Sequence, residues 1–425
     1  MGIIIHGGSL RNLKVQDVLV ADGLIKEIAD SIDPTGHEVF DATGCVLLPG
    51  FVDLHTHLRE PGRENAETIA TGSLAAARGG YVAVTAMANT LPVADTAAIV
   101  EQVASIGRAV GLVDVFPVGA ITKGLEGKEL ADIGSMAQSS AEVRVFSDDG
   151  VCVSNALLMR RALEYVSQFD GVIAQHAQDP ELTRDAQMNE GAMSAKLGLK
   201  GWPAVAEESI IARDILLANM VGARLHICHV TTSGGVEIIR WAKSQGMRVT
   251  AEVTPHHLLL TDDLASTYDP VYKVNPPLRR HEDVLALRSA LADGTIDIVA
   301  TDHAPHPVES KECEWANAAF GMVGLETALP ILFETMVKTG AMSWADIGQV
   351  MSSNPAYIGG YRDHGRALKV GEPAHIAIID PARTYTVDAA SLASKSKNTP
   401  FHGMEFGATV VATLFKGEFT HKVGS

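Results

Sequence analysis

The chain has 425 residues, of which 46% are hydrophobic and 20% are charged, so its composition provides a large core and excludes global disorder. Lys and Arg number 34 against 51 for Asp and Glu, which gives a formal net charge of −17. So acidic a chain disfavours non-specific binding to nucleic acid or to an anionic membrane surface. An anionic substrate would therefore need its own local Arg.

The cysteines and the N-terminal segment bear on the cellular setting. Four cysteines lie far apart without CxxC spacing, which indicates reduced thiols and neither a disulfide scaffold nor a zinc ribbon. The first residues lack the basic segment and apolar stretch of a signal peptide, and no run of about 18 apolar residues occurs. We therefore expect a soluble, cytoplasmic protein.

Short β-rich runs alternate with longer amphipathic stretches through the middle of the chain. The amphipathic stretches, such as 207–222 and 234–246, have apolar residues at helical spacing and a glycine near the end. The β-rich runs occupy residues 46–58, 79–88, 112–121, 142–150, 171–179, 224–232, 248–257 and 296–305. This alternation predicts an α/β fold with parallel strands, most simply a (β/α)8 TIM-like barrel; a doubly wound open sheet is the alternative.

The two ends of the chain do not follow this alternation. Residues 1–50 and 366–425 contain short strand-like runs separated by turn signals such as DG, TG and KG. We expect these ends to form one composite β-domain, a small β-sandwich. The barrel would then be inserted between them over residues 51–365, with the helix-like stretch 343–360 as the bridge back.

Histidine and aspartate residues gather where the predicted strands end. His55 and His57 in DLHTH are two residues apart, so both side chains can share one face of a strand. Later strand ends carry Asp148, Asp149, His176, His226, His229 and Asp302. Because the carboxyl ends of barrel strands converge on one rim, these groups predict a site there for Zn²⁺ or a similar divalent ion.

Several strings in the chain together resemble dihydroorotases of the long bacterial type, in the amidohydrolase superfamily. They include DLHTHLREPG, FSDDGV, HICHVTT, YKVNPPLR, ATDHAPH and SKNTPFHG, and the resemblance covers nearly the whole chain. It implies a hydrolase with one or two Zn²⁺ ions per subunit. The implied metal ligands are His55, His57 and Asp302 for one ion, His176 and His229 for a second, and Asp149 as the bridge.

The bridging ligand is a point where the chain differs from some relatives. Related hydantoinases and other dihydroorotases use a carboxylated lysine on strand 4, whereas this chain has FSDDG, as the long bacterial type does. Asp149 is the expected bridge, and Asp148 is the alternative, expected instead to be a turn or capping residue. Other prominent histidines are expected to lie outside the ligand set: His226 and His303 should face away, and His256 and His257 should be structural.

The resemblance also implies a set of substrate contacts. Its members are Arg59, Asn89, His306, Asn275, Phe320 and Gly321. The first three would hold the carboxylate of dihydroorotate, for which an Arg fork is well suited. Asn275 and the backbone of the last two would address the ring amides, although Asn275 is equally consistent with a turn before two prolines.

The implied reaction is the reversible hydrolysis of (S)-dihydroorotate to N-carbamoyl-L-aspartate in de novo pyrimidine (UMP) biosynthesis. Metal-activated hydroxide would be the nucleophile, and Asp302 would act as general base and then acid. A homo-oligomer, such as a dimer, and an aspartate transcarbamoylase partner are implied as well. The alternatives are another cyclic amidohydrolase (allantoinase or hydantoinase) and a non-catalytic scaffold subunit for the transcarbamoylase.

Small departures from the family pattern bear on substrate preference more than on metal binding. Ala88 stands in MANT where the family usually has proline, and the chain has His176-Ala177-Gln178-Asp179 where HCED is common. The run ESKECE at 309–314 is expected to be a solvated lid after strand 8.

Overall fold

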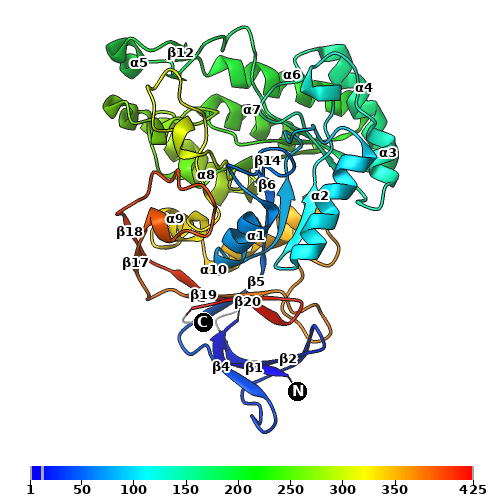
Figure 1. Ribbon diagram of the computed structural model, residues 1–425, viewed down its shortest axis with the longest axis vertical. Helices are drawn as coiled ribbons and strands as arrows, with labels where there is room; N and C mark the ends of the chain where they lie inside the picture. The colour runs from blue at the N-terminus through cyan, green and yellow to red at the C-terminus, as the bar shows by residue number, and fades with distance from the viewer. Residues whose placement is uncertain (1, 11–13, 424–425) are drawn as a thin grey trace.

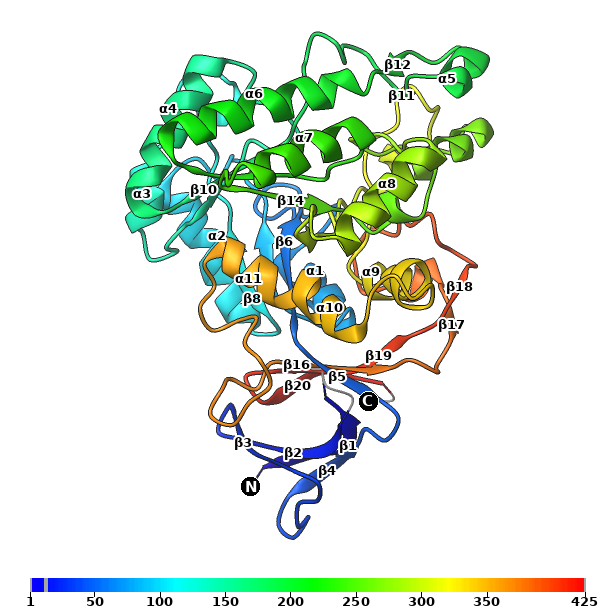
Figure 2. The ribbon, with the colours of Figure 1, turned by 180° about the vertical axis from the view of Figure 1, so that it is seen from behind.

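A computed structural model describes residues 2–10 and 14–423 of the chain (Figure 1). A large α/β part lies above a smaller β part, and both ends of the chain reach the smaller part (Figures 1 and 2). Among the residues described, no helix has both the length and the apolar character needed to cross a membrane.

The strands of the large part close into a barrel. They form a three-stranded and a five-stranded parallel sheet, and the isolated bridges Gly119–Phe146 and Thr56–His303 join the two sheets at both edges. The ring consists of β6 (Phe51–Thr56), β7 (Tyr81–Ala86), β8 (Asp114–Pro117), β9 (Val145–Phe146), β10 (Val172–Gln175), β13 (Arg224–Ile227), β14 (Val249–Val253) and β15 (Ile298–Val299). The predicted barrel is confirmed, and the doubly wound open sheet is excluded.

Helices connect successive strands and cover the outside of the ring (Figure 2). They are α1 (Ile69–Arg78), α2 (Ala97–Val110), α3 (Ile133–Gln138), α4 (Ala156–Val166), α6 (Val205–Val221), α7 (Ser233–Ser244) and α8 (His281–Ala292), followed after β15 by α9 (Ala328–Leu332), α10 (Trp344–Gly348) and α11 (Asn354–Gly359). Helix α4 illustrates the pattern, because Asn155 caps it by accepting from two backbone N–H groups. Its buried face has Met159, Ala162, Leu163 and Val166 at helical spacing, and burying an aliphatic side chain contributes roughly 1.5–3 kcal/mol.

One longer insertion separates β10 from β13. It contains the short paired strands β11 (Met188–Asn189) and β12 (Gly201–Trp202) with helix α5 (Ala192–Leu197) between them. The buried Arg279 ties this insertion to the barrel, because its guanidinium donates to Asn189 Oδ1 at 2.9 Å and to the Trp202 carbonyl at 2.8 Å. The insertion thus forms a fixed wall beside the carboxyl end of β10.

The terminal segments form a second, eight-stranded sheet that curves around its own apolar core (Figure 2). Its strands are β1 (Ile3–Ser9), β2 (Val15–Ala21), β3 (Leu24–Ala29), β4 (Glu38–Asp41), β5 (Val46–Pro49), β16 (Ile376–Asp380), β19 (Thr409–Phe415) and β20 (Glu418–Lys422). Strand β5 pairs with both β1 and β16, so the two ends of the chain share one sheet. Where we expected a sandwich, the hydrogen bonds describe one continuous sheet.

Part of the C-terminal segment leaves this sheet and packs against the barrel. The short paired strands β17 (Tyr385–Thr386) and β18 (Glu405–Phe406) flank a loop in which Phe401 packs with Leu260 and Val274. Residues between 385 and 406 therefore support the loops that follow β14. The division into residues 51–365 and a two-part terminal domain stays a prediction.

Candidate metal centre and active site

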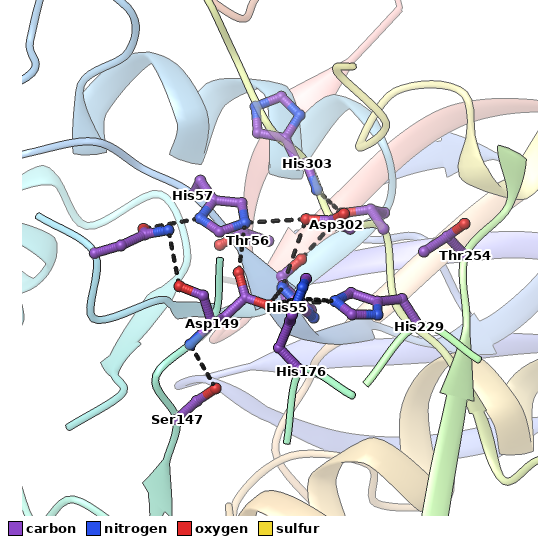
Figure 3. Close-up of polar contacts among 12 residues, drawn as sticks. His55, Thr56, His57, Ser147, Asp149, His176, His229, Thr254, Asp302 and His303 are labelled. Carbon is purple, nitrogen blue, oxygen red and sulfur yellow. Dashed lines mark hydrogen bonds and ion pairs between the residues drawn. The ribbon is translucent and has the colours of Figure 1, made fainter. Parts of the chain in front are cut away.

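The side chains predicted to bind metal meet at the carboxyl ends of the barrel strands (Figure 3). Each lies in or just beyond a strand: His55 and His57 with β6, Asp149 after β9, His176 after β10, His229 after β13 and Asp302 after β15. All of them are buried. The structure therefore brings together the six residues expected as ligands.

Asp149 lies at the centre of this cluster and contacts all four histidines. Its carboxylate oxygens are 3.3 Å from His55 Nε2 and His57 Nε2, 3.2 Å from His176 Nδ1 and 3.3 Å from His229 Nε2. This is the position that a bridging ligand requires.

Asp148 points away from the histidines. One of its oxygens accepts from the backbone N–H groups of Ile121 and Thr122 at 2.7 and 2.9 Å, and the other accepts from the Thr122 hydroxyl. It fixes the loop after β8, in agreement with the turn role expected for it. Between the two aspartates, the geometry favours Asp149 as the bridge.

The cluster fits divalent cations. His55, His57, Asp149 and Asp302 offer donor atoms within 4.8 Å of one another, and Asp149 forms a second such group with His176 and His229. The buried His55 Nε2 has no hydrogen-bond partner.

The electrostatics at His55 also indicate a site for a cation. Burial opposes a charge on His55, yet the carboxylates of Asp149, Glu252 and Asp302 raise its pKa well above the usual value. The potential at His55 therefore favours positive charge, whereas burial and the neighbouring Arg59 lower the pKa of His57. Imidazole and carboxylate donors suit Zn²⁺.

Local backbone conformation aims several of these side chains. Arg59, His229 and Asp302 have φ values of 63°, 32° and 46°, in the left-handed region that non-glycine residues rarely adopt. Such conformations cost on the order of 1–3 kcal/mol and persist where surrounding structure enforces them. They turn the chain sharply after β6, β13 and β15, just where the side chains enter the site.

The ring nitrogens that face away from the cluster are also held. His55 Nδ1 is 2.6 Å from Glu252 Oε1, His57 Nδ1 is 3.0 Å from Asn89 Oδ1, and His176 Nε2 is 2.7 Å from Gln178 Oε1. A hydrogen bond at the far nitrogen leaves the near nitrogen's lone pair free for a metal.

Glu252 is the functional residue that the sequence reasoning missed. It lies in β14, a strand expected to contribute no ligand, and its carboxylate also accepts from His226 Nε2 at 3.0 Å. A single acidic residue inside the apolar strand VTAEV was the only signal for it. Its role is to orient an imidazole, not to contact the cluster centre.

The remaining histidines near the rim lie outside the ligand set. His226 bonds to Glu252 and Thr250, and His303 bonds to Glu67, so both face away from the cluster as expected. His257 is held by Thr254 Oγ1 at 2.7 Å, in agreement with a structural role.

Arg59 is buried beside the metal cluster, with only 7% of its surface exposed. Its Nε donates to the Pro305 carbonyl at 3.2 Å, and within the described part of the chain it forms no ion pair with Asp or Glu. Burial and the nearby Arg63 lower the pKa of Arg59 to about 10, so the guanidinium stays charged at neutral pH. A buried cation without a carboxylate partner predicts an anionic ligand.

The other residues expected to contact substrate surround the same space. His306 donates from Nε2 to the Phe320 carbonyl at 2.7 Å, and a side chain at Gly321, where φ is 138°, would collide with Ala304 Cβ at 2.7 Å. Asn275 has a buried Oδ1 without a hydrogen-bond partner. Asn89 is engaged with His57 and the Asp149 backbone, which links it to the ligands as well.

The loop after β15 differs in one respect from the solvated lid expected for residues 309–314. Lys311 is buried, and its ammonium donates to the carbonyls of Lys273, Ala319 and Gly321 at 3.1, 2.8 and 3.0 Å. The expectation of a solvated run was wrong at this position, because the loop folds back over Lys273, and two carbonyls of the loop and that of Lys273 surround the ammonium.

Comparison with known proteins gives a consistent family assignment. A family model described as dihydro-orotase-like matches residues 44–234. A dihydroorotase of Streptomyces coelicolor is 60% identical, with 98% of this chain and 97% of the relative covered, and one of Mycobacterium tuberculosis is 59% identical over 96% and 95%. The solved L-hydantoinase (dihydropyrimidinase) of Arthrobacter aurescens has a TM-score of 0.87 at 27% identity, covering 100% of this chain and 96% of that one. With these relatives along nearly its full length, the chain belongs to the dihydroorotase family.

Proposed function

We propose that this protein catalyses the reversible, zinc-dependent hydrolysis of (S)-dihydroorotate to N-carbamoyl-L-aspartate, a step of de novo pyrimidine biosynthesis. The observation that carries the proposal is the buried, unpaired Arg59 beside a cluster of metal-ligand side chains. The cluster supports hydrolysis of an amide, and the guanidinium supports a substrate that bears a carboxylate. Dihydroorotate has both features.

The metal part of the proposal places zinc in two positions. His55, His57 and Asp302 would hold one ion, His176 and His229 a second, and Asp149 would bridge. When bound, zinc lowers the pKa of water so that a nucleophile exists at neutral pH, and it polarises the carbonyl under attack. One or two ions per subunit are compatible with this donor set.

Asp302 is proposed to move the proton. Burial alone would raise its pKa, but His55 and His57 lower it below the usual value, so the carboxylate is ionised and can accept a proton. It would take the remaining proton of the attacking hydroxide as the new C–O bond forms. It would then return that proton to the ring nitrogen as the C–N bond breaks, and the synthetic direction reverses these steps.

The substrate would be bound by residues on the side of the site opposite the metal ligands. Arg59, Asn89 and His306 are proposed to bind the carboxylate, and burial together with Arg59 lowers the pKa of His306 to about 3, so its imidazole is neutral there. Asn275 and the backbone of Phe320 and Gly321 would address the ring amides. The free Oδ1 of Asn275 supports this assignment, because a buried acceptor needs a donor.

Two other functions are weaker. A hydantoinase or allantoinase on this fold has no need of an unpaired Arg at the position of Arg59. A scaffold subunit for aspartate transcarbamoylase has no need of a complete ligand set, which this chain retains. A dimeric assembly and a transcarbamoylase partner are compatible with the catalytic proposal, and sedimentation with and without the transcarbamoylase would test both.

The test combines metal analysis with a cyclisation assay on N-carbamoyl-L-aspartate, and with hydantoin and allantoin as alternative substrates. We expect one or two zinc ions per chain, and activity on carbamoyl-aspartate that a chelator abolishes and zinc restores. Faster turnover of hydantoin or allantoin would overturn the substrate assignment. Full zinc content without turnover of any substrate would favour the scaffold.

A further inference from the structure

In the second metal position, the ring nitrogen of His176 that faces away from the metal forms a hydrogen bond with a neutral amide. His176 Nε2 lies 2.7 Å from Gln178 Oε1, while His176 Nδ1 faces Asp149 Oδ1 at 3.2 Å and His229 Nε2 at 2.9 Å. Gln178 follows β10 and is half-buried, beyond the six ligand side chains. Its amide orientation therefore decides which nitrogen of His176 carries the hydrogen.

A chain of hydrogen bonds fixes that orientation. The Thr183 hydroxyl donates to the Asp179 carbonyl at 2.8 Å, so its single hydrogen is used, and it accepts from Gln178 Nε2 at 2.8 Å. Gln178 Oε1 is then the atom that faces His176, and it must receive the hydrogen from Nε2. The lone pair of His176 Nδ1 is thereby directed at the metal position before any metal binds.

The first metal position differs because one of its two histidines meets a carboxylate, whereas its other histidine, His57, meets the neutral amide of Asn89 at 3.0 Å. His55 Nδ1 donates to the carboxylate of Glu252 at 2.6 Å, and that carboxylate also accepts from the backbone N–H of His229 at 3.2 Å. A carboxylate acceptor makes an imidazole a stronger metal ligand than a neutral amide does, because it stabilises the positive charge drawn onto the ring. The first position also has two carboxylate ligands, Asp149 and Asp302, and the second has only Asp149.

We propose that Gln178 is a positioning residue that holds the His176–His229 position at lower metal affinity than the position of His55 and His57. This inference rests on the metal centre of the proposed function. It adds that the two positions differ in metal affinity and that Gln178 sets the difference. Asn275 Nδ2 lies 3.5 Å from the same Gln178 Oε1, so the amide also joins the second position to the residue proposed to address the ring.

The test is a metal-binding titration that does not depend on turnover. Metal-free protein is titrated with Zn²⁺ against a chromophoric chelator, and with Co²⁺ to follow the absorption of each bound ion. In the unsubstituted protein we expect one tight and one weaker equivalent. Gln178→Glu should tighten the weaker equivalent by roughly 10–100-fold, and Gln178→Met should weaken it by a similar factor, with the tight equivalent unchanged in both.

Control variants assign the effect. Gln245→Glu adds the same charge on an exposed residue and should leave both equivalents unchanged. His229→Ala removes a ligand of the second position alone, so Gln178→Glu in that background should have no effect. Equal affinities of the two equivalents in the unsubstituted protein, or Gln178 variants that leave the weaker equivalent unmoved or shift both alike, would overturn the proposal. Gln178-dependent binding without cyclisation activity would instead defeat the proposed function and leave this inference standing.

Discussion

The two sides of the active site are built by different means. On the metal side, every proposed ligand lies at a strand end, and partners such as Glu252, Asn89 and Gln178 hold the far nitrogens of the imidazoles. On the substrate side, His306, Phe320 and Gly321 lie in a long loop with only a short turn at Val308–Ser310. The barrel strands position the first side.

The substrate side is fixed by cations and amides that donate to backbone carbonyls. Lys311 donates to three of them, and Asn398 Nδ2 donates to the carbonyls of Ala304 and Gly321 at 3.0 and 3.2 Å. Side-chain identity therefore matters most on the metal side, and loop geometry matters most on the substrate side. We expect substitutions to abolish metal binding and turnover on the first side and to change KM and selectivity on the second.

The largest effect is expected for His57→Ala. This change removes a ligand and leaves the fold intact, because the carboxyl rim of a barrel is not its core. Metal content should fall by at least one equivalent, and cyclisation activity should be lost. Elemental analysis and circular dichroism of the same preparation test this, and normal metal content with full activity would contradict the ligand assignment.

Asp302→Asn should retain substrate but lose turnover. An amide cannot shuttle the proton, and general acid–base catalysis is worth roughly 10²–10⁴-fold in rate. We expect kcat to fall within that range while substrate still binds, measured by steady-state kinetics and equilibrium binding. Since Asp302 is also a proposed ligand, metal content is measured alongside. A kcat within about tenfold of the unsubstituted protein, about 1.4 kcal/mol in barrier, would require another base.

The Arg59→Met variant tests a residue that lies between the metal side and the substrate side. Removing the charged partner of the substrate carboxylate should cost about 2–5 kcal/mol in kcat/KM for dihydroorotate, the range for breaking a buried charge pair. Any weak activity toward the neutral ring of dihydrouracil should be spared. Arg59→Lys should also be damaging, because an ammonium cannot form the bidentate fork. An equal fall for both substrates would show that Arg59 only holds the loop after β6.

The grouping of the proposed ligand side chains was predictable from the sequence for a physical reason. A period-2 pattern places His55 and His57 together, and the convergence of strand ends in a barrel assembles ligands that are far apart in the chain. Glu252 was missed because its partner His55 is 197 residues away and no local motif marks it. The pairing between the two terminal segments was likewise only partly predictable, because no feature of the β5 sequence indicates that the strand pairs with both β1 and β16.

The loop after β15 shows that a charged residue in a polar run is not always exposed. Glu312, Cys313 and Glu314 are exposed, as the run ESKECE predicts, whereas Lys311 directly before them is buried. Its burial depends on the carbonyls of Lys273, Ala319 and Gly321, which meet only in the folded loop. Composition cannot report such an arrangement.

Lys311→Met should have a smaller effect, confined to the substrate side. The methionine fills the same volume but leaves carbonyls without their donor, and an unsatisfied buried acceptor costs about 1–3 kcal/mol. We expect KM for dihydroorotate to rise about tenfold, with metal content unchanged and kcat changed less. The exposed Lys338→Met serves as the matched control and should behave like the unsubstituted protein. A loss of metal from Lys311→Met would show that the two sides are not separately held.

The pH dependence of stability distinguishes Lys311 from an ordinary lysine and is the smallest effect expected. Burial and the neighbouring Lys273 lower the pKa of Lys311 to about 7, whereas lysine in an unfolded chain titrates near 10.4. Between these values the unfolded chain binds more protons, so this group makes the folded state more stable as pH rises and loses that contribution as pH falls toward 7. Lys311→Met lacks this term. Urea unfolding at pH 7 and pH 9 should therefore show a gap between the two proteins that moves in favour of the unsubstituted protein at pH 9, while Lys338→Met shows no such movement. A gap that stays constant with pH would mean that Lys311 keeps its proton throughout, and that the loop is held by a permanent cation.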